Sequence, residues 1–235
     1  MDQQKPSQVQ IKSVIALYSN GQVQEALDTV LDLIKDYPQE AILHNICGAC
    51  YAGLGQLDTA VKSYEQAIAI KPDYAEAHNN LGVTLQNLRQ LDTALKSYQQ
   101  AVSLNPNYTE AHNNLGNALK ELGQFDEAVK SYEKALAIKP DFADAHYNLG
   151  ITFQGLGQLE SAVESYVAAL DIKPDYAEVF NNLGIVLKEL GQLDTAVKSY
   201  EKAITIKPDF TEAHNNLGVV LKELGQLEAS VKSFE

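Results

Sequence analysis

Histidine recurs in this chain at a spacing that raises the question of metal chemistry. The five histidines stand 34 residues apart, or a multiple of that distance: His44, His78, His112, His146 and His214. Zinc ligands must meet around one ion at about 2 Å each. If each histidine lies on its own structural repeat, neighbouring rings are about 10 Å apart, a typical helix-packing distance. The rings cannot converge on one ion, so we predict packing residues and no metal site.

The two cysteines have a spacing that is typical of redox helices. They form the sequence Cys-Gly-Ala-Cys at Cys47 and Cys50, and their number excludes a disulfide framework. Both fall on positions that the rest of the chain fills with core residues such as Leu81, Ala118 or Val186. A free cysteine in a core behaves as a small hydrophobic residue. We therefore predict buried structural thiols.

Other residue patterns that support catalysis are missing from the sequence. There is no Gly-rich phosphate loop and no serine in a recognisable nucleophile elbow. Carboxylates recur along the chain, but nothing in their pattern brings two of them into one shielded site. The sequence therefore predicts that the protein is not an enzyme and that it needs no cofactor.

A fixed period organises the residues around these histidines. The sequence His-Asn-Asn-Leu-Gly occurs at 78–82, 112–116 and 214–218, with single-residue variants at 146–150 and 180–184. A period between roughly 20 and 50 residues indicates a solenoid of stacked units. We number each unit from 1 to 34, with 75–108 as the reference. Apolar or small residues at positions 3, 4, 7, 8, 11 and 14, and a second such set from position 17, predict two helices per unit.

Glycine and proline mark the ends of these helices. Position 15 is Gly in every unit except 75–108, where it is Arg89, and position 32 is Pro. These residues suit a left-handed helix end and a helix stop, respectively. An Asp or Asn at position 33 precedes an acid at position 2 of the next unit, as in Asp73 and Glu76, which predicts a capping box. Gly at position 8 suggests a close approach of the two helices, and the ring at position 24 is expected to wedge between neighbouring units.

Together these positions resemble the tetratricopeptide repeat. The variant with His-Asn-Asn-Leu-Gly is similar to the repeats of O-linked N-acetylglucosamine transferases and related bacterial proteins. The resemblance implies an all-α, right-handed superhelical solenoid of antiparallel helix pairs. We expect a polar leader at 1–6, a degenerate capping repeat at 7–40, five full repeats at 41–210, and a sixth repeat at 211–235 that is truncated within its second helix.

One helical face is left over for binding. Positions 2, 5, 6, 9, 12 and 13 lie opposite the core side of the first helix. The resemblance implies that this face lines a concave groove and that its asparagines bind peptides. The candidate binding residues are Asn79, Asn80, Asn113, Asn114, Asp144, Tyr147, Asn148, Asn181, Asn182, Asn215 and Asn216.

The asparagines at position 6 are expected to form a ladder along an extended peptide. Each amide offers two donors and an acceptor, which can bond a peptide backbone without selecting its sequence. The alternative is that each one bonds a neighbouring repeat or only solvates the face.

The acids at position 2 either select a basic ligand or only cap helices. Asp144, Tyr147 and Asn148 form a candidate hot spot, since Tyr is enriched at such sites. Neutral drift between repeats would explain the same residues.

Charge and hydropathy limit the class of partner. The 18 basic and 31 acidic residues give a formal net charge of −13. Nucleic-acid binding requires a basic stripe, which is missing, and an anionic membrane is disfavoured for the same reason. There is no apolar run of roughly 18 residues and no secretory signal peptide, so a cytoplasmic location is expected. The expected partner is an extended polypeptide, neutral or basic.

Three functions fit this sequence. The first is a scaffold that binds an extended peptide in its concave groove. The second is the substrate-recruiting arm of a larger enzyme, such as a glycosyltransferase, with a catalytic domain beyond residue 235. The third is a module that associates end to end through an uncapped C-terminus. Five apolar residues there are expected to lack a covering helix: Leu217, Leu221, Leu224, Leu227 and Val231.

Overall fold

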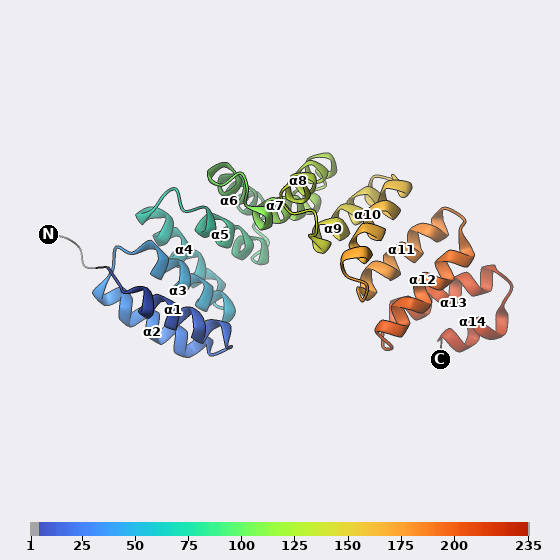
Figure 1. Cartoon of the computed structure of the whole chain (residues 1–235), viewed down its shortest axis with the longest axis horizontal. Helices are drawn as coiled ribbons and strands as arrows, with labels where there is room; N and C mark the ends of the chain where they lie inside the picture. The colour runs from blue at the N-terminus through green and yellow to red at the C-terminus, as the bar shows by residue number, and fades with distance from the viewer. Residues whose placement is uncertain (1–4, 235) are drawn as a thin grey trace. The chain divides into compact units, whose positions relative to one another are not determined.

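The chain is α-helical throughout the part that the structure describes. A computed structural model describes the backbone of residues 5–234, and no strand occurs in that range. The chain divides into two compact units, residues 1–122 and 123–235. Unit 1 contains α1 (Gln8–Ser19), α2 (Val23–Asp36), α3 (Ala41–Gly53), α4 (Leu57–Ile70), α5 (Ala75–Asn87), α6 (Leu91–Leu104) and α7 (Thr109–Glu121) (Figure 1). Unit 2 contains α8 (Phe125–Ile138), α9 (Ala143–Gly155), α10 (Leu159–Ile172), α11 (Ala177–Glu189), α12 (Leu193–Ile206), α13 (Thr211–Glu223) and α14 (Leu227–Phe234).

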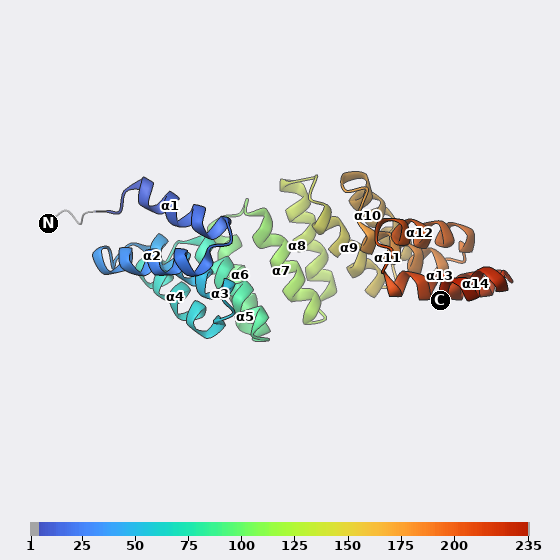
Figure 2. The same ribbon diagram turned by 90° about the horizontal axis from the view of Figure 1, so that it is seen from below.

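Within each unit the helices pack as successive antiparallel pairs. Each helix contacts the next one along the chain, as the views in Figures 1 and 2 show for α3, α4, α5 and α6. The odd-numbered helices, which begin the repeats, also contact one another: α1 with α3, α3 with α5 and α5 with α7, and in unit 2 α9 with α11 and α11 with α13. We call these the inner helices. The predicted all-α solenoid of helix pairs is confirmed.

The turn between the two helices of a repeat uses a left-handed residue, as predicted. The six glycines at position 15 have φ between +72° and +79°: Gly21, Gly55, Gly123, Gly157, Gly191 and Gly225. Arg89 takes the same conformation with φ +61°, although a side chain is strained there by about 1–2 kcal/mol. The turn geometry is therefore imposed by the fold and does not depend on glycine.

Gly at position 8 makes room for the ring at position 24. A Cβ atom added to Gly82 would lie 2.7 Å from Cδ1 of Tyr98, and one added to Gly150 would lie 2.5 Å from Cε1 of Tyr166. Both tyrosines are buried. The ring lies over the glycine of its own repeat, and its hydroxyl interacts with the next repeat, at Thr84 for Tyr64 and at Asn182 for Tyr166. It therefore lies between repeats, as the sequence suggests. A larger residue at position 8 would expel the ring from the core.

The first helices of the full repeats begin differently from the prediction. Among the inner helices that the structure describes, only α1 has a capping box, between Ser7 and Gln10. The N-cap of α5 is Tyr74, and its side chain makes no capping bond. The predicted box at Asp73 and Glu76 and its equivalents are wrong, because the helix begins one residue later than that motif requires.

Histidine secures these helix starts instead. The Nε2 atom of His78 lies 3.0 Å from the carbonyl oxygen of Pro72, six residues earlier. The other four histidines make the same contact at 2.9–3.0 Å: His44, His112, His146 and His214. A carbonyl oxygen can only accept, so Nε2 carries the proton. The 34-residue spacing of histidine therefore reflects a repeated bond between turn and helix.

Both cysteines are buried thiols, as predicted. Cys47 is 3% exposed, Cys50 is 0% exposed, and neither forms a disulfide. Burial raises the pKa of both thiols, that of Cys50 to about 11. A high pKa keeps a thiol protonated and unreactive at neutral pH. The Cys-x-x-Cys spacing is therefore part of the core of α3.

The last repeat covers more of its apolar surface than expected. Leu217 and Leu221 are buried, at 8% and 6% exposure, and Leu224 is half-buried. The expectation that they are uncovered is wrong, because these side chains belong to the core that α13 shares with its neighbours. Leu227 and Val231 on α14 are 62% and 58% exposed, as expected. Among the described residues, no helix is both long and apolar enough to span a membrane.

Candidate peptide-binding surface

Four of the asparagines at position 6 donate a hydrogen bond to a side chain of the preceding repeat. The Nδ2 atom of Asn80 donates to Oδ1 of Asn45 at 3.1 Å. The same bond joins Asn114 to Asn79 at 3.1 Å and Asn216 to Asn181 at 3.0 Å. Asn182 donates to the hydroxyl of Tyr147 at 3.2 Å, because position 5 of that repeat is tyrosine. One of the two alternatives from the sequence, a bond between repeats, is therefore present.

The two asparagine positions differ in exposure. At position 5, Asn79, Asn113 and Asn181 are 6%, 7% and 3% exposed, whereas Asn215 on α13 is exposed. The position 6 residues are half-buried: Asn80, Asn114, Asn148, Asn182 and Asn216. The position 5 amides thus lie between inner helices, and the position 6 amides lie at the surface. Within each unit, we call the face formed by positions 2, 5, 6, 9, 12 and 13 of its inner helices the inner surface.

The acids at position 2 stand at the edge of the inner surface. Glu76, Glu110, Asp144 and Glu212 are exposed. Glu178 is half-buried, and one of its oxygens lies 3.7 Å from Nζ of Lys207. Because these helices lack the predicted capping boxes, the carboxylates are not used to cap them. Their charge is available at the inner surface.

Tyr147 is held firmly within unit 2. Its ring centroid lies 5.2 Å from that of Tyr176 and 6.2 Å from that of Tyr166. The Tyr176 hydroxyl donates to Oδ1 of Asp144 at 3.2 Å. Burial, with a contribution from the carboxylate of Glu178, raises the pKa of Tyr147. The sequence did not single out Tyr176, although an aromatic residue at position 34 precedes α5, α7, α9, α11 and α13.

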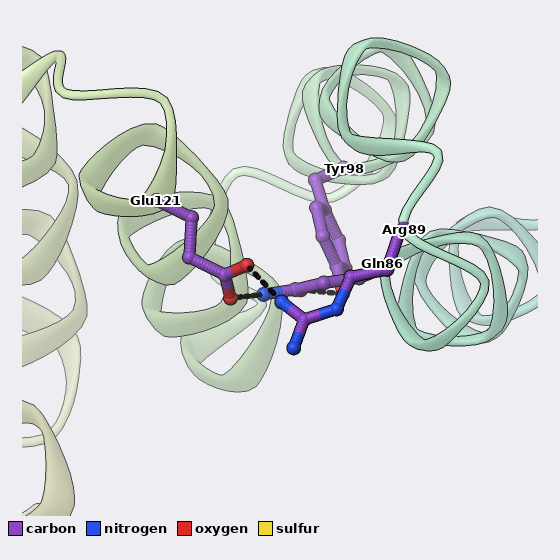
Figure 3. A network of polar contacts seen from close by, with 4 residues as sticks. All are labelled: Gln86, Arg89, Tyr98 and Glu121. Atoms are coloured by element: carbon purple, nitrogen blue, oxygen red, sulfur yellow. Dashed lines mark hydrogen bonds and ion pairs between the residues drawn. The ribbon is translucent and has the colours of Figure 1, made fainter.

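A second row of polar contacts crosses between inner helices at positions 12 and 13. In unit 1 the Gln86 amide donates to Glu121, and Arg89 lies 3.5 Å from the same carboxylate (Figure 3). The Tyr98 hydroxyl donates to Oε1 of Gln86 at 2.9 Å, which connects the buried ring to this row. In unit 2 the equivalent pair is Lys188 and Glu223 at 3.0 Å. These contacts join successive repeats at the far end of the inner helices.

Unit 1 also contains an apolar hollow that the candidate residues do not include. Its volume is about 290 Å³, and it is lined by Ile15, Tyr18, Ile42, Asn45, Ile46, Ala49, Tyr74, Glu76 and Asn80. Repeat 41–74 has Ile42 at position 2 and Ile46 at position 6, where the following repeats have an acid and an asparagine. That departure was the sequence signal. Among the described residues, no group of histidine, cysteine and carboxylate side chains could hold a metal ion.

Solved structures of similar fold are known, whereas no curated protein sequence matches this chain. MamA is 27% identical with a TM-score of 0.65, covering 68% of this chain and 94% of its own. YrrB, described as a TPR protein with an unusual peptide-binding site, is 21% identical with a TM-score of 0.66, covering 78% and 95%. PilF of Pseudomonas aeruginosa is 19% identical with a TM-score of 0.72, covering 90% of each chain.

A family model agrees with these likenesses. The model described as a TPR repeat matches residues 48–88, 90–123, 116–157, 155–191 and 186–225. These segments cover more than half of the chain, and they include the inner helices α5, α7, α9 and α11. Arrays of this fold typically serve as non-catalytic scaffolds for protein interactions. The chain belongs to the tetratricopeptide repeat family.

Proposed function

We propose that the chain is a non-enzymatic, cytoplasmic scaffold that binds an extended polypeptide along its inner surface. The observation that carries this proposal is the row of half-buried amides at position 6, of which Asn80, Asn114, Asn182 and Asn216 are oriented by a bond to the preceding repeat. In unit 1 the row includes Asn80 and Asn114, whose bonds to position 5 are both 3.1 Å long. A site that is oriented before binding loses less entropy when its ligand arrives.

The bond to the neighbouring repeat leaves hydrogen-bonding capacity on the amide of Asn80. A carboxamide has two N–H donors and an oxygen with two lone pairs. In Asn80 one donor is used by Asn45, and the oxygen accepts from Asn79 at 3.5 Å. The second donor is left for a ligand carbonyl. Neighbouring amides are about 10 Å apart, which suits every third residue of an extended chain.

Charge favours a neutral or basic partner. The exposed carboxylates at position 2 lie on the same face as the amides, and the chain carries a net charge of −13. Nucleic acid and anionic membranes are not proposed as partners, since both require a basic surface. In unit 2 the hot spot is proposed at Asp144, Tyr147 and Asn148. There the ring of Tyr147, which is held by its contacts with Tyr166 and Tyr176, offers a rigid apolar face, and the carboxylate of Asp144 supplies the negative charge.

The test is a pull-down from cell lysate with wild type and with Asn80, Asn114, Asn148 and Asn182 all changed to Ala. We expect the variant to lose the partners that wild type retains, because ligand contacts are removed along both units. A matched control changes Gln99, Gln100, Glu133 and Lys134 to Ala, which are exposed residues of α6 and α8. Equal retention by wild type and the asparagine variant, with both folded by circular dichroism, would refute the proposal.

End-to-end association is a second candidate, favoured by the exposure of α14. Leu227 and Val231 are 62% and 58% exposed on one short helix. If they join two copies, sedimentation of wild type should show a mass that grows with concentration. A variant with Leu227→Glu and Val231→Glu should remain monomeric. A strictly monomeric wild type at high concentration would exclude this role.

A further inference from the structure

The apolar hollow of unit 1 is formed by three successive inner helices. Ile15 and Tyr18 of α1 form one wall and remain 44% and 38% exposed. Ile42, Ile46 and Ala49 of α3 form the floor. Exposed apolar side chains around a recess of this kind mark an interaction site more often than isolated ones do.

Three polar residues that line the hollow are hydrogen-bonded to one another. Asn80 donates to Oδ1 of Asn45 at 3.1 Å, and the Asn45 amide in turn points to the hydroxyl of Tyr74 at 3.5 Å. Burial, with the negative charge of Glu76 nearby, raises the pKa of Tyr74 to about 12, so its hydroxyl stays neutral. These bonds persist when an apolar side chain enters the hollow, and the second N–H donor of Asn80 stays available for a backbone carbonyl of the same ligand.

The rim of the hollow carries negative charge. Glu76 lines the hollow and is exposed, whereas its counterpart one repeat earlier is Ile42. An apolar ligand group that packs on Ile42, Ile46 and Ala49 thus has the carboxylate of Glu76 on one side. The volume of about 290 Å³ lies at the lower limit of small-molecule sites, which suits a single large side chain better than a cofactor.

We propose that this hollow receives one large aliphatic or aromatic side chain of the extended partner, with a basic residue of that partner next to it at Glu76. The inference rests on the proposed function and adds an anchor to it. Backbone bonds to the asparagine row give little sequence selection. A single buried side chain fixes the register of the peptide on the inner surface, as hot-spot residues do in other interfaces.

The same chain shows how the hollow can be closed. In repeat 143–176, position 5 is Tyr147 instead of asparagine, and its ring lies against Tyr176, the counterpart of Tyr74. Asn45→Tyr would place a ring at the corresponding point between Tyr74 and Asn80. The fold already accepts tyrosine at this position, and Asn182 shows that its hydroxyl can replace the asparagine oxygen as acceptor.

The experiment uses a displayed library of random dodecapeptides, selected against the full wild-type chain. Enriched peptides are synthesised, and their dissociation constants are measured by calorimetry. We expect them to share a large apolar residue beside a Lys or Arg. Asn45→Tyr should weaken them at least about tenfold, because burying one such side chain is worth that much. Replacing the apolar residue with Ala should weaken binding to wild type equally and make the peptide insensitive to Asn45→Tyr.

Two further variants make the result specific. Ile42→Glu introduces the acid that later repeats carry at position 2, and it should also weaken binding while preserving the helix. The control is Gln99→Ala, which changes an exposed residue of α6 outside both the hollow and the inner surface, and affinity should stay within about twofold. Circular dichroism and melting curves establish that each variant is folded.

The outcomes separate this inference from the proposed function. Peptides that lack a shared apolar residue, or that bind Asn45→Tyr and Ile42→Glu as well as wild type, would overturn the anchor. The groove proposal would stand in that case if Asn80→Ala with Asn114→Ala still weakened them. If no peptide is enriched, or if the asparagine changes have no effect on those that are, the proposed function fails and the anchor with it.

Discussion

In repeat 41–74 position 5 is Asn45, and in repeat 143–176 it is Tyr147. Both side chains accept a bond from the position 6 asparagine of the next repeat, at 3.1 and 3.2 Å. Beside Asn45 a hollow of about 290 Å³ remains, whereas Tyr147 packs its ring 5.2 Å from Tyr176. The two repeats thus share the hydrogen bond from the position 6 asparagine of the next repeat, but differ in whether a ring or a hollow lies next to it.

The two repeats also share the residues that build their frame. Each has a position 8 glycine under a position 24 tyrosine, a left-handed glycine in the turn, and a histidine bonded to a proline carbonyl. Because the frame is repeated, a single side chain on the inner surface can change without disturbing the stack. We infer that specificity in this array arises from such local changes.

The largest expected effect tests whether the frame is equivalent in the two repeats. Gly48→Ala and Gly150→Ala each place a Cβ atom within 2.7 Å of a buried ring. We expect both to lower the free energy of unfolding by about 1–3 kcal/mol, since overpacking displaces the ring. Urea denaturation measures the loss.

The matched control is Gly155, which lies on α9 together with Gly150. A Cβ atom at Gly155 would lie 3.5 Å from Phe125, an ordinary contact, so Gly155→Ala should be neutral or stabilising. A large loss for only one of Gly48→Ala and Gly150→Ala would show that the frames are not equivalent.

We call repeat 41–74 the open repeat, because of its hollow, and repeat 143–176 the filled repeat, because Tyr147 packs against Tyr176. Tyr147→Asn gives the filled repeat the position 5 residue of the open one. We expect a loss of about 0.5–1.5 kcal/mol from the ring contacts with Tyr176 and Tyr166, because an asparagine oxygen can still accept from Asn182. Chemical denaturation measures it, with Tyr147→Phe as the control that keeps the rings and removes the hydroxyl. If Tyr147→Phe is the more destabilising of the two, the hydrogen bond outweighs the ring contacts and our comparison is wrong.

Arg89→Gly gives repeat 75–108 the turn residue of its neighbours. We expect a gain of about 1 kcal/mol from relief of the left-handed conformation, reduced by loss of the exposed ion pair with Glu121. The gain is measured as a higher urea midpoint. Glu121→Gln separates the ion pair from the backbone effect. A lower midpoint for Arg89→Gly than for Glu121→Gln would mean that the turn carries no strain.

The smallest effect concerns position 10, which is Cys50 in the open repeat and Thr152 in the filled one. The folded pKa of Cys50 is raised by burial from 9.0 to about 11. As pH rises, the thiol therefore loses its proton in the unfolded chain before it does in the folded one. The free energy of unfolding that Cys50 contributes is complete below pH 9 and is lost as pH rises toward 11. We expect a loss below about 1 kcal/mol at pH 9.5. The pH dependence of unfolding for wild type and Cys50→Val should differ by this amount, and parallel curves would contradict it.

Much of the architecture was predictable because each helix repeats its signals at one period. Glycine at position 15, proline at position 32 and the buried cysteines all behave as their types suggest. The helix starts were predicted wrongly, since Asp73 resembles a cap but the helix begins after Tyr74. The hydrogen bond between a position 6 asparagine and position 5 of the preceding repeat was only one of two alternatives. Whether these two side chains meet depends on how the repeats stack, and a single repeat does not determine the stacking. The hollow at Ile42 and Ile46 was not predicted, because its signal is a break in the recurrence at positions 2 and 6 and not a recurring residue.

The central claim is that a polypeptide binds on the inner helices at the position 6 amides. The most direct test is nuclear magnetic resonance of the asparagine side-chain amides during titration with an enriched dodecapeptide. We predict that the Nδ2 signals of Asn80 and Asn114, both in unit 1, shift with the same dissociation constant as the calorimetric one. Shifts confined to the even-numbered helices, for example at Gln99 and Gln100 of α6, would contradict the account.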